Sequence, residues 1–263
     1  MNLNDRQALA EIVRSIDAGV SVVLATVVQT SRSVPRRPGS KMLVYADGRT
    51  VGTIGGGEME SRVVAQSLVC FSTRQPHLCT YQLLDPRNGD PGVCGGEVVV
   101  SLEPFMPTPT VYVIGCGHVG KAVVELAHWL GFRVIATDDR ADLVGKEALP
   151  LADDTICGHI SEAIAAFPIT EETHVVVVTR NMGLDVDIVP HLLASNARSI
   201  GVMGSKRRWD ETRAALVAKG VAKHDLEKVT APIGIELHAE TPEEIAVSIL
   251  AEIVAQRRTP DAS

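Results

Sequence analysis

From residue 111 onward, short apolar runs alternate with segments of helical periodicity. The runs VYVIG, VIATD, HVVVVT and SIGVMG have the length of strands, and helical patterns follow at 118–130, near 161–167, at 186–195 and from 206. A capping box, TPEE at 241–244, starts a last helix. Uninterrupted apolar runs such as 175–178 indicate strands buried on both faces of a parallel sheet. We therefore predict a Rossmann-like, doubly wound parallel-sheet domain of the α/β class over residues 111–263.

A glycine motif, GCGHVG at 115–120, joins the first of these strands to its helix, and a carboxylate, Asp138, follows 18 residues beyond it at the end of the next strand. In dinucleotide-binding folds the first glycine permits a tight turn and the second lets a pyrophosphate approach the backbone amides. The third glycine allows close packing, and the carboxylate binds a ribose hydroxyl. Asp138 favours NAD over NADP, although Arg140 leaves NADP open, and glycines that serve packing alone are the alternative. The residues predicted to bind NAD or another adenine nucleotide are Gly115, Gly117, His118, Gly120 and Asp138.

The first 104 residues predict a smaller α/β domain. Helical spacing covers 4–18, and strands are expected at 21–28, on both sides of the Asp47-Gly48 turn, near 80–84 and at 97–104. The segment PFMPTPT at 104–110 carries three prolines and is typical of a stiff connector. We predict domains at 1–104 and 111–263, with a linker at 105–110.

Two loops of this first domain have the residues of an anion site. Gly55, Gly56 and Gly57 lie where a strand ends and a helix begins, so their amides could face an oxyanion; close backbone packing is the alternative. Arg36 and Arg37 lie in a loop with two further cations, and guanidinium groups donate paired hydrogen bonds to phosphate. A solvated loop is the alternative for the two arginines.

Cysteine usage bears on both compartment and metal binding. The five cysteines are odd in number and never in CxxC spacing, which fits neither a disulfide framework nor a structural zinc site. We expect a reducing compartment. Cys94 precedes two glycines and could present a thiolate to a soft metal, whereas a lone cysteine is more often inert core.

Composition excludes several classes of protein. Hydrophobic residues make up 45% and charged residues 22%, as in globular proteins, which argues against intrinsic disorder. The net charge of -7 disfavours a nucleic-acid partner. The sequence shows neither a signal-peptide pattern at its start nor an apolar stretch long enough to cross a membrane. We expect a cytoplasmic homo-oligomer that binds neither nucleic acid nor membrane.

Several segments together resemble the XdhC/CoxI family of accessory proteins for molybdenum hydroxylases such as xanthine dehydrogenase. They are PRRPGSKMLV, DGRTVGTIGGGEME, VCGGEVVVSLEP, VYVIGCGHVGKAVVELAHWLGFRVIATDDR, IGVMGSKRR and APIGIELHAETPEEIAVSILAEIV. The resemblance spans nearly the whole chain, and the order and spacing of the segments make it specific.

This resemblance implies a chaperone rather than a catalyst. Such a protein binds molybdenum cofactor (molybdopterin with its metal), supports its sulfuration by a partner sulfurtransferase and delivers it to an apo-hydroxylase. Carried over by position, Gly55, Gly56, Gly57 and Cys94 match motifs of the family's first domain, with Cys94 as the expected metal contact. The glycines of 115–120 and Asp138 match the Rossmann fingerprint.

Two other functions remain open. An NAD(P)-dependent oxidoreductase is less favoured because the sequence has no His, Lys or Tyr whose spacing identifies it as an acid or base for hydride transfer. A nucleotide-sensing scaffold without a molybdenum role is the other alternative.

Overall fold

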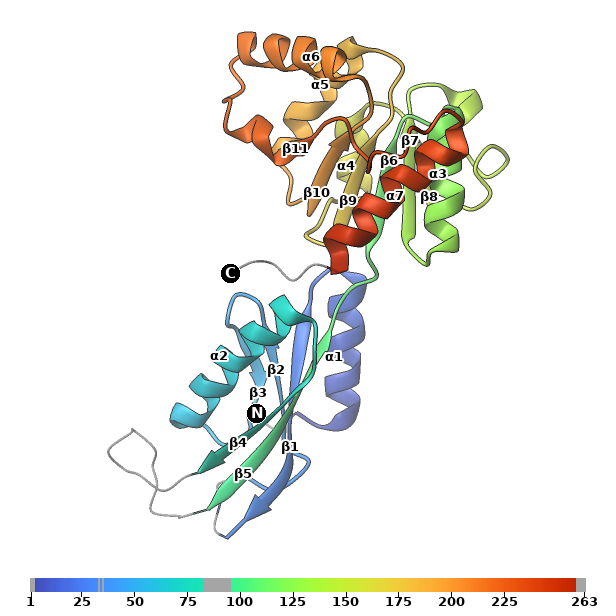
Figure 1. Cartoon of the computed structure of the whole chain (residues 1–263). Coiled ribbons are helices and arrows are strands. Elements are labelled where there is room, and N and C mark those ends of the chain that lie inside the picture. The colour runs from blue at the N-terminus through green and yellow to red at the C-terminus, as the bar shows by residue number, and fades with distance from the viewer. Residues whose placement is uncertain (1–2, 33, 35, 83–95, 259–263) are drawn as a thin grey trace. The chain divides into compact units, whose positions relative to one another are not determined.

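The computed structural model describes residues 3–32, 34, 36–82 and 96–258 (Figure 1). The chain divides into two compact units between Pro107 and Thr108, inside the proline-rich segment. We call them the N-terminal unit and the C-terminal unit and describe each by itself.

The N-terminal unit is built on an antiparallel sheet of five strands in the order β3-β2-β1-β5-β4. Its elements are α1 (Asp5–Asp17), β1 (Val22–Ser31), β2 (Lys41–Tyr45), β3 (Thr50–Gly52), α2 (Gly57–Thr73), β4 (His77–Gln82) and β5 (Glu97–Phe105). The expected hairpin joins β2 to β3, where Gly48 has a φ of 81° that favours glycine. Strand β1 extends beyond its expected end because its second half pairs with β5.

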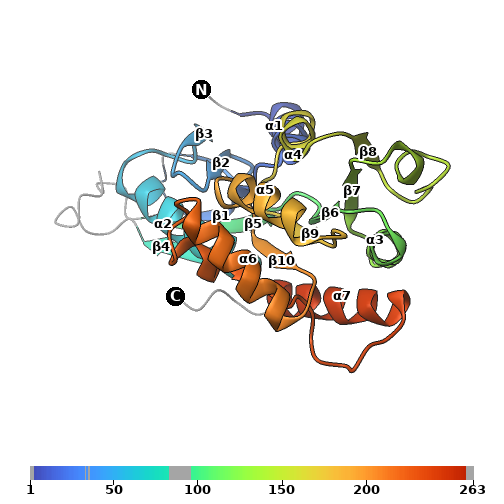
Figure 2. The ribbon, with the colours of Figure 1, turned by 90° about the horizontal axis from the view of Figure 1, so that it is seen from above.

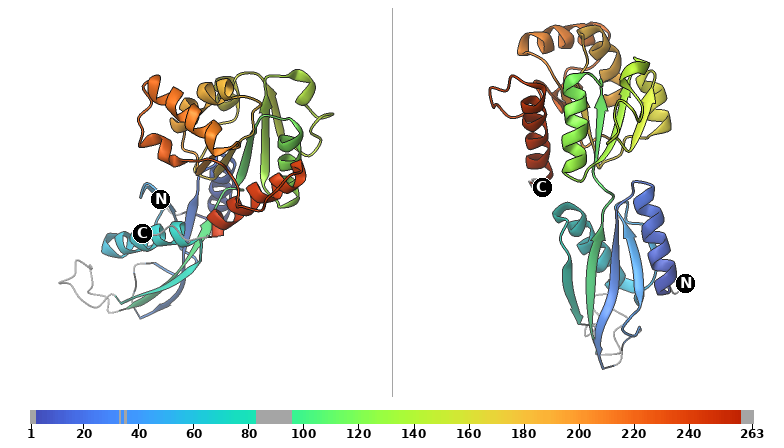
Figure 3. Two further views of the ribbon diagram at one scale, coloured as in Figure 1. Left: turned by 45° about the horizontal axis from the view of Figure 1, so that its top comes forward. Right: turned by 90° about the vertical axis from the view of Figure 1, so that its right-hand side faces the viewer.

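The sheet of the N-terminal unit is covered by a helix on each face, as Figure 3 shows. One core lies between the sheet and α2 and contains Val63 and Cys70 of that helix. The other lies between the sheet and α1, where Ala8 and Ile12 are buried. The unit is therefore a three-layer α/β/α arrangement.

The register brings several loops of this unit to one end of its sheet. Strands β1 and β4 both end there, since Ser31 and Gln82 each lie opposite Glu97. Strand β3 ends in the same direction, with Gly52 opposite Met42 near the start of β2. The loop 32–40 and the glycine turn 53–57 therefore start from the same end of the sheet.

The C-terminal unit contains a parallel sheet of six strands in the order β11-β10-β9-β6-β7-β8. Numbered within the unit, this is the strand order of a Rossmann fold, and the predicted fold class is confirmed. The strands are β6 (Thr110–Ile114), β7 (Arg133–Asp138), β8 (Asp154–Cys157), β9 (Thr173–Val177), β10 (Ser199–Val202) and β11 (Val229–Thr230). The helices are α3 (His118–Trp129), α4 (Ile160–Ala166), α5 (Met182–Leu193), α6 (Lys206–Ala218) and α7 (Pro242–Arg258), with short turns η2 (Ala141–Leu143) and η3 (Asp225–Lys228).

Helices cover both faces of this sheet. Helices α3 and α7 pack together on one face, and α4, α5 and α6 cover the other (Figure 2). The capping box forms at the start of α7, where Glu244 accepts from the Thr241 amide at 3.1 Å and donates its own amide to the Thr241 hydroxyl at 3.2 Å. Helix α5 begins four residues before the expected 186, because the Asn181 side chain caps it by accepting from the Leu184 amide.

Candidate functional site

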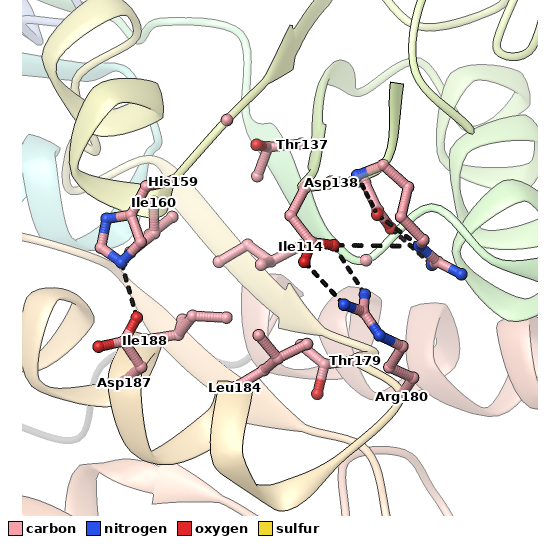
Figure 4. A pocket seen from close by; sticks show the side chains of 14 residues that line it. Ile114, Thr137, Asp138, His159, Ile160, Thr179, Arg180, Leu184, Asp187 and Ile188 are labelled. Carbon is pink, nitrogen blue, oxygen red and sulfur yellow. Dashed lines mark hydrogen bonds and ion pairs between the residues drawn. The ribbon is translucent and has the colours of Figure 1, made fainter. Parts of the chain in front are cut away.

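A pocket lies at the carboxyl ends of strands β6, β7, β8 and β9, where ligands bind in open α/β sheets (Figure 4). It holds about 480 Å³ of empty space, part of it open to solvent. Its position falls at β6 and β9, where the chain order of the strands reverses. The lining residues are Ile114, Gly115, Thr137, Asp138, Asp139, Arg140, Gly158, His159, Ile160, Thr179, Arg180, Leu184, Asp187 and Ile188.

The three glycines of the GCGHVG motif differ in their surroundings. Gly115 has a φ of +103°, and a Cβ there would lie 2.7 Å from the carbonyl oxygen of Val178. A Cβ at Gly120 would overlap the carbonyl oxygen of Gly115, so this glycine allows α3 to pack closely against the turn. A Cβ at Gly117 would meet nothing within 4 Å. Space for the approach of a ligand therefore lies at the second glycine, where α3 begins without a side-chain cap.

The side chain of His118 is exposed, whereas that of Thr137 is buried in the lining of the pocket. His118 is the first residue of α3, and its side chain is exposed. Thr137 lies at the end of β7, is 2% exposed and lines the pocket. Its hydroxyl has no hydrogen-bond partner among the described residues. A buried hydroxyl without a partner is costly, so a ligand that bonds to it would gain free energy.

The carboxylate of Asp138 is buried at the end of β7 and already has four hydrogen bonds. It accepts from the Cys116 amide at 2.7 Å, and from the amide and guanidinium of Arg140 at 2.8–3.0 Å. Burial raises the pKa of Asp138, but the bonds from Arg140 and Cys116 outweigh it and leave the pKa below its usual value. A ribose hydroxyl would have to compete with Arg140 for this carboxylate.

A second ion pair joins the strands on either side of β6. Arg180, which follows β9, donates to both carboxylate oxygens of Asp139 at 2.7 Å (Figure 4). This paired bond lowers the pKa of Asp139. Both side chains are about half exposed, so an incoming phosphate can reach Arg180.

The pocket has a third polar group, far from Arg180 in Figure 4. His159, at the start of α4, places its Nε2 atom 2.6 Å from the Oδ2 atom of Asp187 on α5. His159, Arg180, Asp187 and the apolar lining were not predicted as site residues from the sequence. The sequence did contain a pattern that could have indicated the α5 residues, because the spacing of Leu184, Asp187 and Ile188 places them on one face of a helix.

The glycine turn of the N-terminal unit is occupied by a side chain of the same segment. Gly55, Gly56 and Gly57 have φ values of 147°, 84° and 68°, which favour glycine. The Oε1 atom of Glu60 accepts from the amides of Ile54, Gly55 and Gly56 at 2.9–3.2 Å. Two of the three amides that the sequence offered to an oxyanion, those of Gly55 and Gly56, thus hold an internal carboxylate, which a ligand would have to displace.

Of the other candidate residues in the N-terminal unit, the structure describes Arg36 and Arg37 but not Cys94. Arg36 is half-buried and Arg37 is exposed, and neither has an ion-pair partner among the described residues. Lys41, by contrast, pairs with Asp5 at 2.8 Å. Cys94 lies outside the described residues, so its expected contact with a metal stays a prediction.

Across the described ranges, no three His, Cys, Asp or Glu side chains gather as a metal site would require. The four described cysteines are free thiols. No helix in the described part of the chain is long and apolar enough to cross a membrane.

Comparison with known families identifies both parts of the chain. Residues 111–253 match the XdhC Rossmann domain, and residues 15–82 match the XdhC and CoxI family. The first match alone covers more than half of the chain.

Three curated relatives are similar to the chain. The protein YqeB of Escherichia coli (strain K12) is 33% identical over 88% of this chain and 42% of its own length. A protein of Bacillus subtilis (strain 168), named as a probable subunit of xanthine dehydrogenase, is 32% identical over 60% of this chain and 46% of its own length. The chain thus spans less than half the length of these two relatives. The molybdenum cofactor insertion chaperone PaoD of E. coli is 20% identical over 96% of this chain and 88% of its own length.

One solved structure supports the fold of the whole chain. A protein of Bacillus halodurans described as a xanthine dehydrogenase covers 99% of this chain and 98% of its own, with a TM-score of 0.52 and 21% identity. At that identity the likeness concerns the fold alone.

Proposed function

The chain belongs to the XdhC and CoxI family, and from this premise we propose that it is an accessory protein for a molybdenum hydroxylase. The observation that carries the proposal is the match of both units to this family, in the order of its two domains. The similarity to a molybdenum cofactor insertion chaperone over most of both chains supports it. In this proposal the protein binds molybdenum cofactor, supports its sulfuration by a partner sulfurtransferase and inserts it into a xanthine dehydrogenase-like enzyme, working as a cytoplasmic homo-oligomer.

Two arginines of the N-terminal unit are the proposed binding residues for the phosphate of molybdopterin. Arg36 and Arg37 lack ion-pair partners among the described residues and lie in a loop at the same end of the sheet as the glycine turn. Cys94 is the proposed thiol ligand because thiolates suit soft, sulfur-rich centres. When bound, the cofactor would bring its own molybdenum and dithiolene sulfur.

The test is to purify the full chain from cells that make molybdenum cofactor and to measure its molybdenum and pterin content. Transfer to an apo-hydroxylase is then followed by hydroxylase activity. Cys94→Ser should fold but carry less molybdenum and activate poorly, whereas Cys157→Ser, at an exposed cysteine, should match wild type. Full molybdenum content and full activation by Cys94→Ser would remove the thiol assignment, and absence of any pterin from the wild type would remove the accessory role.

The arginine assignment has a separate test. Replacing both Arg36 and Arg37 by alanine should weaken cofactor binding, and the loss should shrink as salt rises, since exposed charges are screened within about 8 Å at physiological ionic strength. Arg6→Ala, an exposed arginine on α1, is the matched control. Equal cofactor affinity of the double variant at low salt would exclude the arginines.

We further infer that the pocket of the C-terminal unit binds a heterocyclic ligand that carries phosphate. The uncapped start of α3, the open space at Gly117 and the unpartnered Thr137 hydroxyl support this inference. NAD, expected from the motif, is one such ligand.

Calorimetry with NAD, NADP, ATP, AMP and GMP tests this inference. Gly117→Trp should abolish binding without unfolding the protein, because a side chain there enters open space. His128→Trp, at an exposed position near the end of the same helix, is the control. Unchanged affinity in Gly117→Trp would exclude the site. An NAD(P)-dependent oxidoreductase would instead show turnover of NADH or NADPH with a substrate, and a nucleotide-sensing scaffold would bind nucleotide without activating a hydroxylase.

A further inference from the structure

The pocket of the C-terminal unit has two polar ends and an apolar middle. Arg180 lies on one side of the pocket, and His159 with Asp187 lies on the other (Figure 4). Arg180 pairs with Asp139, and Arg140, which also lines the pocket, pairs with Asp138. The apolar part of the lining comes from Ile114, Ile160, Leu184 and Ile188. Such a layout fits a flat heterocycle between apolar side chains, with its anionic substituent toward the arginines and one edge toward Asp187.

The hydrogen bonds of His159 determine whether the ring edge of the ligand would face hydrogen-bond donors or acceptors at this end of the pocket. The Nδ1 atom of His159 lies 2.8 Å from the Ser161 hydroxyl and 3.2 Å from the Ser161 amide, where it caps α4. The Nε2 atom lies 2.6 Å from the Oδ2 atom of Asp187, and because a carboxylate only accepts, Nε2 is the donor of this bond. His159 thus fixes the orientation of Asp187 and keeps it as a hydrogen-bond acceptor.

Asp187 has acceptor capacity left over. Its Oδ2 atom accepts one bond from His159, while Oδ1 has no partner among the described residues. A carboxylate provides about four acceptor positions on its two oxygens. The side chain is 54% exposed and lines the pocket, so a ligand can reach it. This end of the pocket can therefore take two adjacent N–H donors and offers no donor in return.

We propose that Asp187, oriented by His159, reads the ring edge of the ligand and selects the 2-amino-4-oxopyrimidine edge that guanine and pterin rings share. That edge presents a ring N–H beside an amino group, two donors that match the two carboxylate oxygens. Adenine presents its amino group beside a ring nitrogen acceptor, which would face a carboxylate oxygen without a proton between them. This inference rests on the proposed ligand site in the pocket and specifies its ligand class; the Thr137 hydroxyl, buried and unpartnered in the same lining, is independent evidence for a bound ligand.

The test measures binding of GMP, AMP, xanthosine monophosphate and 6-hydroxymethylpterin monophosphate, each of which carries one phosphate, to the full chain by calorimetry. Wild type should bind GMP or the pterin about tenfold to a hundredfold more tightly than AMP, the range expected for one well-formed pair of hydrogen bonds. Tighter binding of the pterin would assign the site to a pterin, and tighter binding of GMP would assign it to a guanine nucleotide. AMP binding as tight as both would overturn the proposal.

Asp187→Asn should reverse the preference between GMP and xanthosine monophosphate, which a merely structural role of Asp187 would not do. Xanthine has an oxygen where guanine has the amino group, and the asparagine amide can donate to that oxygen while its carbonyl accepts from the ring N–H. The variant should lose affinity for GMP and gain affinity for xanthosine monophosphate, whereas Asp210→Asn, the same charge change at an exposed position on α6, should do neither.

An unchanged ratio of the two affinities in Asp187→Asn would overturn the assignment of Asp187. Failure of all four probes to bind would overturn the whole inference. Neither result would affect the accessory role, which is judged separately by molybdenum content and activation of an apo-hydroxylase.

Discussion

Glu60 shows how one side chain can settle the conformation of a glycine-rich turn. Its carboxylate accepts from the Thr53 hydroxyl and from the consecutive amides of residues 54–56, so these donors need no external anion. Burial raises the pKa of Glu60, but the bonds from Thr53, Gly56, Ile54 and Gly55 outweigh it and leave the pKa below its usual value. The charged form therefore stabilises the folded state.

Glu60→Ala should lower the free energy of unfolding by about 1–2 kcal/mol at pH 7, because it leaves several amide donors without their acceptor. A group with a lowered folded-state pKa stabilises above its unfolded pKa, about 4.3, and loses that contribution as the pH falls through the folded value. The difference between wild type and variant should thus be constant down to about pH 5 and shrink below pH 4. Urea unfolding across this range measures it.

Two neighbouring variants complete this test. Glu60→Gln keeps one acceptor oxygen without the charge, so its loss should be smaller and should vary less with pH. Glu58→Ala removes only the partly exposed pair with Arg62, and should cost less than about 0.5 kcal/mol. A difference between wild type and Glu60→Ala that grows on acidification would contradict the role assigned to the Glu60 carboxylate.

At the scale of elements, a buried ion pair holds the ends of β9, α5 and α6 together behind the pocket. Asp185 of α5 is fully buried, and Arg208 of α6 donates to its Oδ2 atom and to the carbonyl of Thr179 after β9. The Thr179 hydroxyl also donates to Asp185. Because Thr179 and Arg180 are adjacent, this cluster positions the segment that carries the Arg180 guanidinium.

Arg208→Ala should lower the free energy of unfolding by about 3 kcal/mol, because it leaves the Asp185 carboxylate buried without its partner. Arg207, the residue before Arg208, forms an exposed pair with Glu211, and Arg207→Ala should cost less than about 0.5 kcal/mol. Chemical denaturation of the two variants provides the comparison. Equal losses would mean that the buried pair contributes no more than the exposed one.

At the scale of the whole molecule, the sequence was sufficient for the order of the elements but not for the polar contacts of the pocket. Alternating apolar runs and helical spacing predicted the parallel sheet, because burial on both faces leaves a strong local pattern. The pairs Asp139–Arg180 and His159–Asp187 join residues 41 and 28 positions apart, so only the strand order brings them together. The bond of Glu60 to Gly56 spans four positions and could have been found from the spacing alone.

The buried cores give a final prediction at this scale, since each of the four core clusters lies within a single unit. Separate cores permit separate unfolding transitions, which two-state analysis of the whole chain would miss. The chain has two tryptophans, Trp129 and Trp209, and both belong to the C-terminal unit. Tryptophan fluorescence therefore follows that unit, with Trp209 packed against its core, while far-ultraviolet circular dichroism follows both.

Glu60→Ala weakens the N-terminal unit, so it should lower the urea midpoint of the dichroism transition that fluorescence does not follow and leave the fluorescence midpoint unchanged. Arg208→Ala weakens the C-terminal unit and should lower the fluorescence midpoint. A ligand that binds the pocket should raise the fluorescence midpoint of wild type by mass action, since it stabilises only the unit that holds it. If Glu60→Ala moves the fluorescence midpoint as far as the dichroism midpoint, the two cores unfold as one cooperative structure and the prediction fails.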